Sequence, residues 1–263
     1  CTIIKRGWSL SMDNITNFPP HRDQELEELL QDSLDSGNRI WVIGDIHGYK
    51  STLDLLISKL ELNPDDIVVC LGDMIDRGPD SVGVVELFEN SDNLFVIKGN
   101  HEEMLLLDWS KTNGNGSYSS DGFWSSQDPL TRERMMGVVR YISSLPTEIV
   151  LREYRLVHAG YKWLPYSATL DEQTDSCRLH SRDIFTVSFP FDEERTIIVG
   201  HTTIQNFGIL DDNTVWSSDR LLADGRTSAI GIDTGIYLKP EKNPRISAIE
   251  LGSGRVISQK RSE

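Results

Sequence analysis

The stretch Ile40-Trp41-Val42-Ile43-Gly44-Asp45-Ile46-His47-Gly48 decides the fold, because it joins an apolar run to a turn that carries an aspartate and a histidine. The apolar run predicts a buried strand that ends at Gly44. Two further stretches repeat the arrangement after strands expected over 67–71 and 94–97: Gly72-Asp73-Met74-Ile75-Asp76-Arg77-Gly78 and Gly99-Asn100-His101-Glu102. In each case polar side chains follow directly on a buried strand.

Helical patterns separate these strands, over about Lys50–Leu60 and Asp80–Asn90. The order β-α-β-α-β with short loops predicts a parallel sheet and places the chain in the α/β class. Open sheets of this class bind ligands at the carboxyl ends of their strands, and neighbouring strands lie about 5 Å apart. We therefore expect the three motifs to meet at one edge of the sheet.

The residue types in the motifs favour a metal site. Aspartate, histidine and asparagine suit Mg, Mn, Fe or Zn, and several sets in series indicate two metals at a shared site. Asp73 and Asp76 support this interpretation, since paired carboxylates are costly unless a cation compensates them. Gly-Asp after a strand is by itself a common turn, so the prediction depends on the whole series.

Four of the six histidines stand at predicted strand ends: His47, His101, His158 and His201. The last two follow strands expected over 155–157 and 196–199. This shared context favours a role as ligands or catalytic groups. In contrast, His21 and His180 are expected to be ordinary structural residues.

The rest of the chain has less distinctive patterns. Residues 1–22 look like a loosely ordered lead-in, and a helix is expected over about 23–35. We therefore assign 1–38 to an N-terminal extension with a lead-in helix, and 39–263 to the main domain. Segment 111–129, rich in Gly, Ser and Asn with aromatics, is expected to be an inserted loop, either a substrate-facing lid or a surface insertion. A hairpin is expected near the end, over 245–251 and 255–257.

Composition excludes several function classes. The chain has 263 residues, 38% apolar and 25% charged, as in a soluble globular protein. Its formal net charge of −15 argues against a nucleic-acid partner, and the acidity by itself can simply confer solubility. No apolar run is long enough for a membrane helix, and no signal-peptide pattern is evident. With three cysteines a disulfide framework is not expected, so we predict a cytoplasmic protein.

The ordered motifs, with the two later histidines, resemble the metallophosphoesterase (calcineurin-like) superfamily. Within it they resemble the bacterial and phage-type serine/threonine protein phosphatases of the phosphoprotein phosphatase family, from about Arg39 to Leu251. The resemblance implies a sandwich of two mixed β-sheets flanked by helices, with a dimetal site at the strand ends. It implies one metal held by Asp45, His47 and Asp73, and a second held by Asp73, Asn100, His158 and His201.

The resemblance also implies catalytic roles. His101 matches the family's general acid, and Asp76 matches the carboxylate that orients it. Arg77 and Arg182 match phosphate-binding arginines, although the tryptophan that usually precedes the second is absent here. Asn100 would also contact the substrate. The motif Asp233-Thr234-Gly235 matches a structural element of the family, to which we assign no chemistry.

The implied reaction is hydrolysis of a phosphomonoester on a phosphoprotein or a small molecule. A hydroxide that bridges two divalent metals would attack in line, and a histidine would protonate the leaving group. Manganese, iron and zinc are candidate metals. One alternative is a symmetrical dinucleoside tetraphosphatase, but those enzymes tend to lack the Asp of Asp-Arg-Gly and to carry Gly-Asn-His-Asp, so Asp76 and Glu102 favour a protein phosphatase. The other is a non-catalytic metal-binding regulator, which predicts at least one lost ligand or acid.

Overall fold

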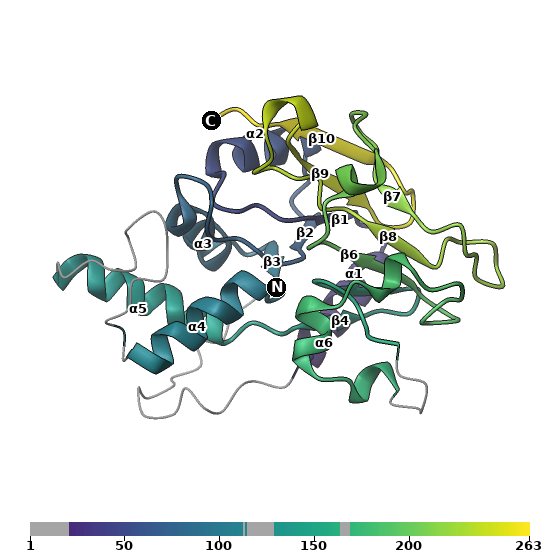
Figure 1. Ribbon diagram of the computed structural model, residues 1–263, viewed down its shortest axis with the longest axis horizontal. Coiled ribbons are helices and arrows are strands. Elements are labelled where there is room, and N and C mark those ends of the chain that lie inside the picture. The colour runs from purple at the N-terminus through teal and green to yellow at the C-terminus, as the bar shows by residue number, and fades with distance from the viewer. Residues whose placement is uncertain (1–20, 113, 115–128, 164–168) are drawn as a thin grey trace.

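The strands form two sheets that pack face to face (Figure 1). The computed structural model describes residues 21–112, 114, 129–163 and 169–263, and within these residues each sheet has five strands. The first sheet has the order β10-β9-β1-β2-β3, and the second has the order β4-β5-β6-β8-β7. Both sheets are mixed, as the resemblance implied.

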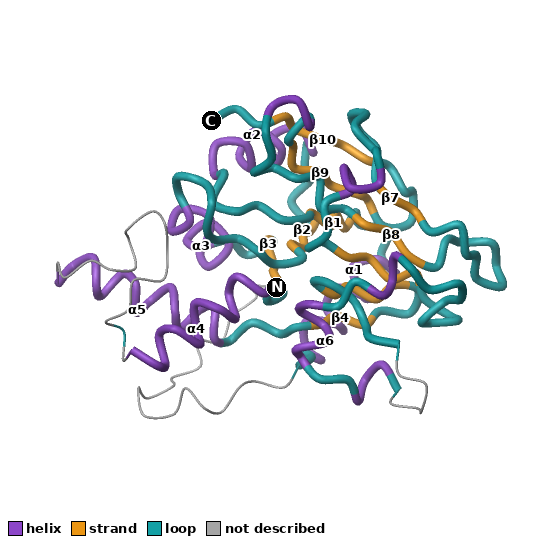
Figure 2. Tube along the Cα trace, viewed as in Figure 1, coloured by secondary structure: helices purple, strands orange, loops and turns teal. Residues whose placement is uncertain are grey.

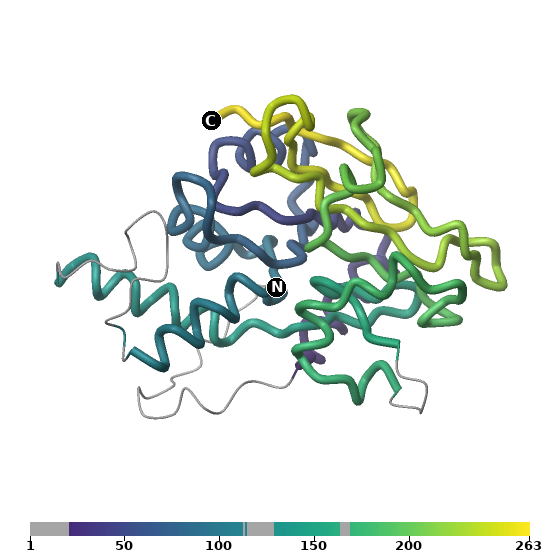
Figure 3. Tube along the Cα trace, in the orientation of Figure 1, coloured from purple at the N-terminus to yellow at the C-terminus, as the bar shows by residue number. Residues whose placement is uncertain are grey.

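The first sheet contains the strands that precede the three motifs. β1 (Ile40–Ile43), β2 (Ile67–Cys70) and β3 (Leu94–Val96) run parallel, which confirms the prediction from the β-α-β-α-β order. The C-terminal hairpin of β9 (Arg245–Glu250) and β10 (Val256–Lys260) adds to this sheet, with β9 antiparallel to β1. Figure 3 shows these last strands, in yellow, beside the first part of the chain.

The second sheet supplies the other two histidines. β5 (Tyr154–Val157), β6 (Thr196–Val199) and β8 (Ala229–Gly231) run parallel. β4 (Glu148–Val150) and β7 (Trp216–Ser217) pair antiparallel at its two edges. The strands predicted before His158 and His201 are therefore present.

Within the described ranges, six α-helices flank the sheets, and most gather on one side of the strands (Figure 2). They are α1 (Gln24–Asp35), α2 (Lys50–Leu60), α3 (Ser81–Asn90), α4 (Asn100–Thr112), α5 (Pro129–Ser143) and α6 (Asp175–His180). Short 3-10 turns cover 170–172, 183–185, 204–207 and 240–242. No helix among the described residues is long and apolar enough to cross a membrane.

Alternation along the strands divides the core into layers. In β1, Ile40 and Val42 point between the two sheets and pack with Leu156 and Ile198 of the second sheet. The intervening residues, including Trp41, point to the opposite face, where α2, α3, α4 and α5 cover the first sheet. Because both faces of these short strands are buried, the apolar runs are continuous, as expected for a parallel sheet with two covered faces.

The structure corrects the prediction for the segment 111–129 and tests only part of the prediction for the N-terminal extension. Helices α4 and α5 were not predicted. Both ends of the segment expected to be a loop over 111–129 are helical, because α4 extends to Thr112 and α5 begins at Pro129. Residues 113 and 115–128 lie outside the described residues, so its role as a lid stays a prediction. Residues 1–20 of the expected extension also lie outside them, whereas the lead-in helix is confirmed as α1, with Asp23 capping it through the Leu26 amide.

Candidate metal centre

All six predicted ligand residues meet at the carboxyl ends of the central strands. Asp45 and His47 follow β1, Asp73 follows β2, Asn100 follows β3 and opens α4, and His158 and His201 follow β5 and β6. The two sheets are joined at this point, because the Asp45 carboxylate from the first sheet accepts a hydrogen bond of 3.0 Å from the His201 amide of the second. The packing of the sheets thus assembles the site.

The first set of ligand atoms comes from Asp45, His47 and Asp73. His47 Nε2 lies 3.9 Å from Asp45 Oδ2 and 3.7 Å from Asp73 Oδ2. All three residues are buried. His47 Nδ1 lies 3.0 Å from the Ile75 carbonyl oxygen, and donating its hydrogen there leaves the Nε2 lone pair free for a metal.

The second set surrounds the side-chain oxygen of Asn100. His158 Nε2 lies 2.9 Å and His201 Nδ1 lies 2.8 Å from Asn100 Oδ1. His158 Nε2 is also 3.4 Å from Asp73 Oδ1, and its Nδ1 faces the Leu71 carbonyl at 2.8 Å. Asp73 therefore turns one carboxylate oxygen to each set, which is the position of a bridging ligand.

The donor chemistry fits divalent metals. Burial and the nearby Glu102 raise the pKa of Asp73 to about 8, and burial together with Asp233 and Asp73 raises the pKa of Asp45. Burial lowers the pKa of His47 and His158, and with the charge of Arg182 it lowers the pKa of His201 to about 3. Crowded carboxylates beside neutral imidazoles are the donors that a divalent cation satisfies.

One close contact points to the same conclusion. His158 Nδ1 faces the Leu71 carbonyl, which can only accept a hydrogen, so the neutral ring presents the Nε2 lone pair to Asn100 Oδ1 at 2.9 Å. Two acceptors this close repel each other unless a cation lies beside them. The residues present therefore fit a metal centre on an observation independent of the resemblance.

The backbone of the site is conformationally unusual. Several non-glycine residues here have positive φ: His47 (50°), Asp73 (51°), Asp76 (71°), Arg77 (72°) and His201 (62°). Such conformations are costly and persist where the surroundings enforce them, most often at functional sites. Glycine is needed close by, because a Cβ on Gly99 would lie 2.2 Å from Asp73 Oδ1.

The predicted acid and its partner are paired. His101 Nδ1 lies 2.6 Å from Asp76 Oδ2, and the His101 ring is 4.8 Å from that of His47 between ring centroids. Although burial favours the neutral ring, the hydrogen bond to Asp76 and the charge of Asp73 outweigh it and raise the pKa of His101. Arg77 Nη2 approaches the other nitrogen, His101 Nε2, at 3.4 Å.

Glu102 has a structural role that sequence reasoning missed. Its fully buried carboxylate accepts hydrogen bonds from the backbone amides of Asp73 (2.8 Å), Met74 (2.8 Å) and Gly99 (2.9 Å). It therefore fixes the turn that carries Asp73. A signal was available, because a glutamate three residues after the turn that starts a helix matches half of a capping box.

The second arginine follows α6 on the side of His201. The charge of Arg182 contributes, after burial, to the low pKa of His201, so it lies near the second ligand set. His180 also borders the site: its ring centroid is 6.3 Å from that of His201, and its Nε2 lies 2.9 Å from Glu103 Oε2. Its role as an ordinary structural residue stays a prediction. His21 contacts β4 through its backbone carbonyl.

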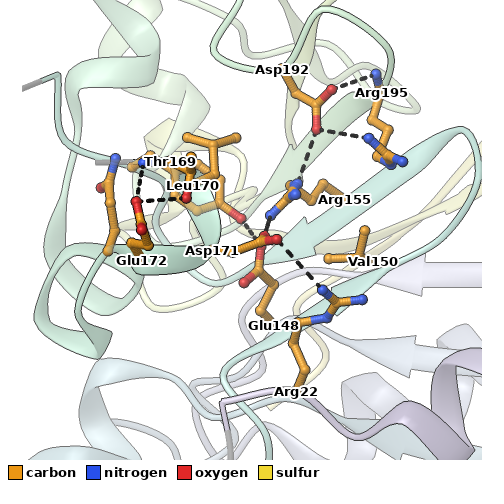
Figure 4. Close-up of polar contacts among 12 residues, drawn as sticks. Arg22, Glu148, Val150, Arg155, Thr169, Leu170, Asp171, Glu172, Asp192 and Arg195 are labelled. Carbon is orange, nitrogen blue, oxygen red and sulfur yellow. Dashed lines mark hydrogen bonds and ion pairs between the residues drawn. The ribbon is translucent and has the colours of Figure 1, made fainter. Parts of the chain in front are cut away.

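A buried network of charges supports the segment that carries Arg182. Arg155 lies between Glu148 and Asp192 in Figure 4, with its Nε 3.0 Å from Asp192 Oδ2. Arg178 of α6 donates to Glu148 at 2.9 Å, and its carbonyl accepts the amide of Ala159 at 2.8 Å. The network thus ties α6 to the residue after His158.

Comparison with known proteins identifies the family. Residues 38–225 match the family described as calcineurin-like phosphoesterase, so the chain belongs to it. Members of this family are phosphoester hydrolases that depend on two metals. The family assignment agrees with the two ligand sets at the strand ends.

The individual relatives are named either serine/threonine phosphatases or symmetrical tetraphosphatases. The chain is 31% identical over 176 residues to serine/threonine-protein phosphatase 2 of Salmonella typhimurium, which covers 63% of this chain and 80% of that protein. It is 46% identical over 76 residues to a symmetrical bis(5'-nucleosyl)-tetraphosphatase of Wigglesworthia glossinidia brevipalpis, 27% of each. A solved structure described as a yeast serine/threonine phosphatase similar to human PP5 shares the fold, with a TM-score of 0.53 at 17% identity, and covers 91% of this chain and 87% of that one.

Proposed function

We propose that this phosphoesterase is a serine/threonine protein phosphatase that works with two divalent metal ions. The observation that supports it best is the pairing of His101 with Asp76 at 2.6 Å, beside both ligand sets and within 3.4 Å of Arg77. A proton donor, the carboxylate that orients it and a guanidinium that can bind phosphate therefore lie together beside the candidate metal ligands. Together these groups can protonate a leaving alkoxide and stabilise the charge of a phosphomonoester during hydrolysis.

The chain's own residues divide the work as follows. Two divalent ions, when bound, supply Lewis acidity that activates water and draws charge from the phosphoryl oxygens. Arg77 and Arg182 bind the remaining phosphoryl oxygens through their guanidinium N–H groups, and Asn100 faces the same space. Asp76 accepts the Nδ1 hydrogen of His101, which directs Nε2 toward the ester oxygen. The departing alkoxide takes its proton from Nε2.

The substrate class rests on two residues and one relative. Asp76 and Glu102 favour the protein-phosphatase branch, and the relative that matches over most of its own length is named a serine/threonine phosphatase. Symmetrical tetraphosphate hydrolysis is the second candidate, because a relative of that name shares 46% identity over 76 residues. We infer no nucleic-acid partner from the net charge of −15, and we propose a cytoplasmic location.

A substrate panel on manganese-loaded protein tests the proposal. Its members are peptides with phosphoserine, phosphothreonine or phosphotyrosine, diadenosine tetraphosphate, and a simple aryl phosphate. We expect the first two peptides to give the highest kcat/KM. Higher kcat/KM on the tetraphosphate would move the assignment to the second candidate. No turnover of any substrate by fully loaded protein would instead support a non-catalytic regulator.

Replacement of His101 tests its proposed role as the general acid. His101→Asn should lower kcat on a phosphopeptide by about 10² to 10⁴-fold, because the alkoxide would leave without its proton donor. The manganese content should remain near that of the wild type, since His101 belongs to neither predicted ligand set. Full activity of this variant would remove His101 from the role of acid.

A further inference from the structure

The loop after β8 brings an aromatic side chain to the metal centre. Arg77 Cζ lies 3.8 Å from the centroid of the Tyr237 ring, so the guanidinium is over the ring face. The same ring meets His47 edge-on, with centroids 5.1 Å apart and an interplanar angle of 87°. Tyr237 therefore touches both a predicted metal ligand and a predicted phosphate-binding arginine.

The loop that carries Tyr237 is built to be rigid. Asp233 and Thr234 are buried, the Asp233 carboxylate accepts the Gly235 amide at 2.9 Å, and the Thr234 hydroxyl donates to the Arg245 carbonyl at 2.8 Å. Gly235 has φ +62°, where a Cβ would lie 2.5 Å from Leu238 Cδ1. The motif to which we assigned no chemistry thus fixes the backbone of the loop two residues before Tyr237.

The ring of Tyr237 covers one face of the Arg77 guanidinium. Its backbone is fixed, because the next residue, Gly78, donates to the His47 carbonyl at 2.8 Å. The guanidinium contacts the Tyr237 ring and approaches His101 Nε2 at 3.4 Å. An arginine side chain has many rotamers, and stacking one face of the guanidinium selects among them while its N–H edge stays available to phosphate.

We propose that Tyr237 is a positioning residue that aims the Arg77 guanidinium at the substrate phosphate. The contact is through the ring face, since the Tyr237 hydroxyl makes no hydrogen bond to any residue that the structure describes. A phenylalanine should therefore replace it, whereas an aliphatic residue of similar size should not. The proposal rests on the phosphate-binding role of Arg77 in the proposed function.

A double-mutant cycle on phosphate binding tests this directly. The ligand is inorganic phosphate, titrated calorimetrically into manganese-loaded protein, so no turnover is required. Tyr237→Leu should weaken the Kd by about three- to tenfold, and Tyr237→Phe should stay within about twofold of the wild type. In an Arg77→Ala background, Tyr237→Leu should have no further effect. Tyr237→Met replaces the leucine variant if that protein fails to fold.

The outcomes separate the proposal from its alternatives. Equal weakening by Tyr237→Phe and Tyr237→Leu, or the same loss with Arg77 already removed, would overturn it. Loss of manganese from Tyr237→Leu would also overturn it, because the ring would then support His47. Tyr154→Leu, at the opposite end of β5 from His158, should leave the phosphate Kd unchanged. If the wild type binds phosphate but hydrolyses no phosphopeptide, only the proposed substrate class fails.

Discussion

The carboxylate of Glu102 offers the sharpest test of how the metal centre is held together. One of its oxygens accepts the amides of Asp73 and Gly99, and the other accepts the amide of Met74. In Glu102→Gln, one of these acceptors becomes an NH₂ group that faces a backbone donor. At least one buried N–H then loses its partner, and the others lose a charged acceptor.

The cost follows from the hydrogen bonds. A bond to a charged group contributes about 1.5–3 kcal/mol, and an orphaned buried donor adds to the loss, so Glu102→Gln should destabilise the metal-loaded protein by about 3 kcal/mol. For a chain of this size that corresponds to a melting temperature roughly 6–12 °C lower. Because Asp73 moves with its turn, the manganese Kd should also rise by about 10- to 100-fold.

The neighbouring residue supplies the control. Glu103 accepts a hydrogen bond from the exposed His180 and contacts no backbone amide of the Asp73 turn within the described residues, so Glu103→Gln should change stability by less than about 1 kcal/mol. Thermal melts and manganese titrations of both variants provide the comparison. The reasoning would be refuted if Glu102→Gln melted and bound manganese like Glu103→Gln.

Three further outcomes follow from the structure. The acid must be protonated, so kcat should fall as pH rises through the raised pKa of His101, and Asp76→Asn should move that fall to lower pH, which a kcat–pH profile measures. Chelation should lower the melting temperature, and readdition of manganese should restore it in the wild type but not in Asp73→Asn. Although burial opposes ionisation, hydrogen bonds from Arg39 and a backbone amide lower the pKa of Asp66. The ionised Asp66 carboxylate therefore stabilises the folded protein fully above about pH 4, and this stabilisation is lost as pH falls through the lower pKa of the folded state. Urea melts of chelated wild type and Asp66→Asn should accordingly converge as pH falls below about 4.

Most of the first sheet could be predicted because its signals are local. The apolar run of β1 and the periodic pattern of α2 each lie within a dozen residues, and both elements appear with the predicted bounds. Helix α4 was missed because it begins at Asn100, inside a motif that was analysed for its ligands. Glu102 was used only to choose between branches of the family, although acids in a first turn, here Glu102 and Glu103, also mark a helix start.

The candidate site was likewise predictable in part. The types and order of the candidate ligands were evident from the chain, because each follows a recognisable strand. Their pairing was not: Asn100 receives His158 and His201 only because β5 and β6 of the second sheet end beside β3 of the first. The contacts of Glu102 depend likewise on two turns about 30 residues apart coming together.

By itself, the amino-acid sequence determined the α/β class, the strand ends that carry ligands, and the kind of chemistry that aspartate, histidine and asparagine can support. Tertiary structure alone decided which oxygen of Asp73 faces which histidine, where His180 lies, and that Tyr237 covers Arg77. The physical reason is how far apart in the sequence the interacting residues lie. Strand and helix signals come from neighbours along the chain, whereas the orientation of a side chain in a metal centre is set by packing between segments that the sequence separates by up to 190 residues, as for His47 and Tyr237.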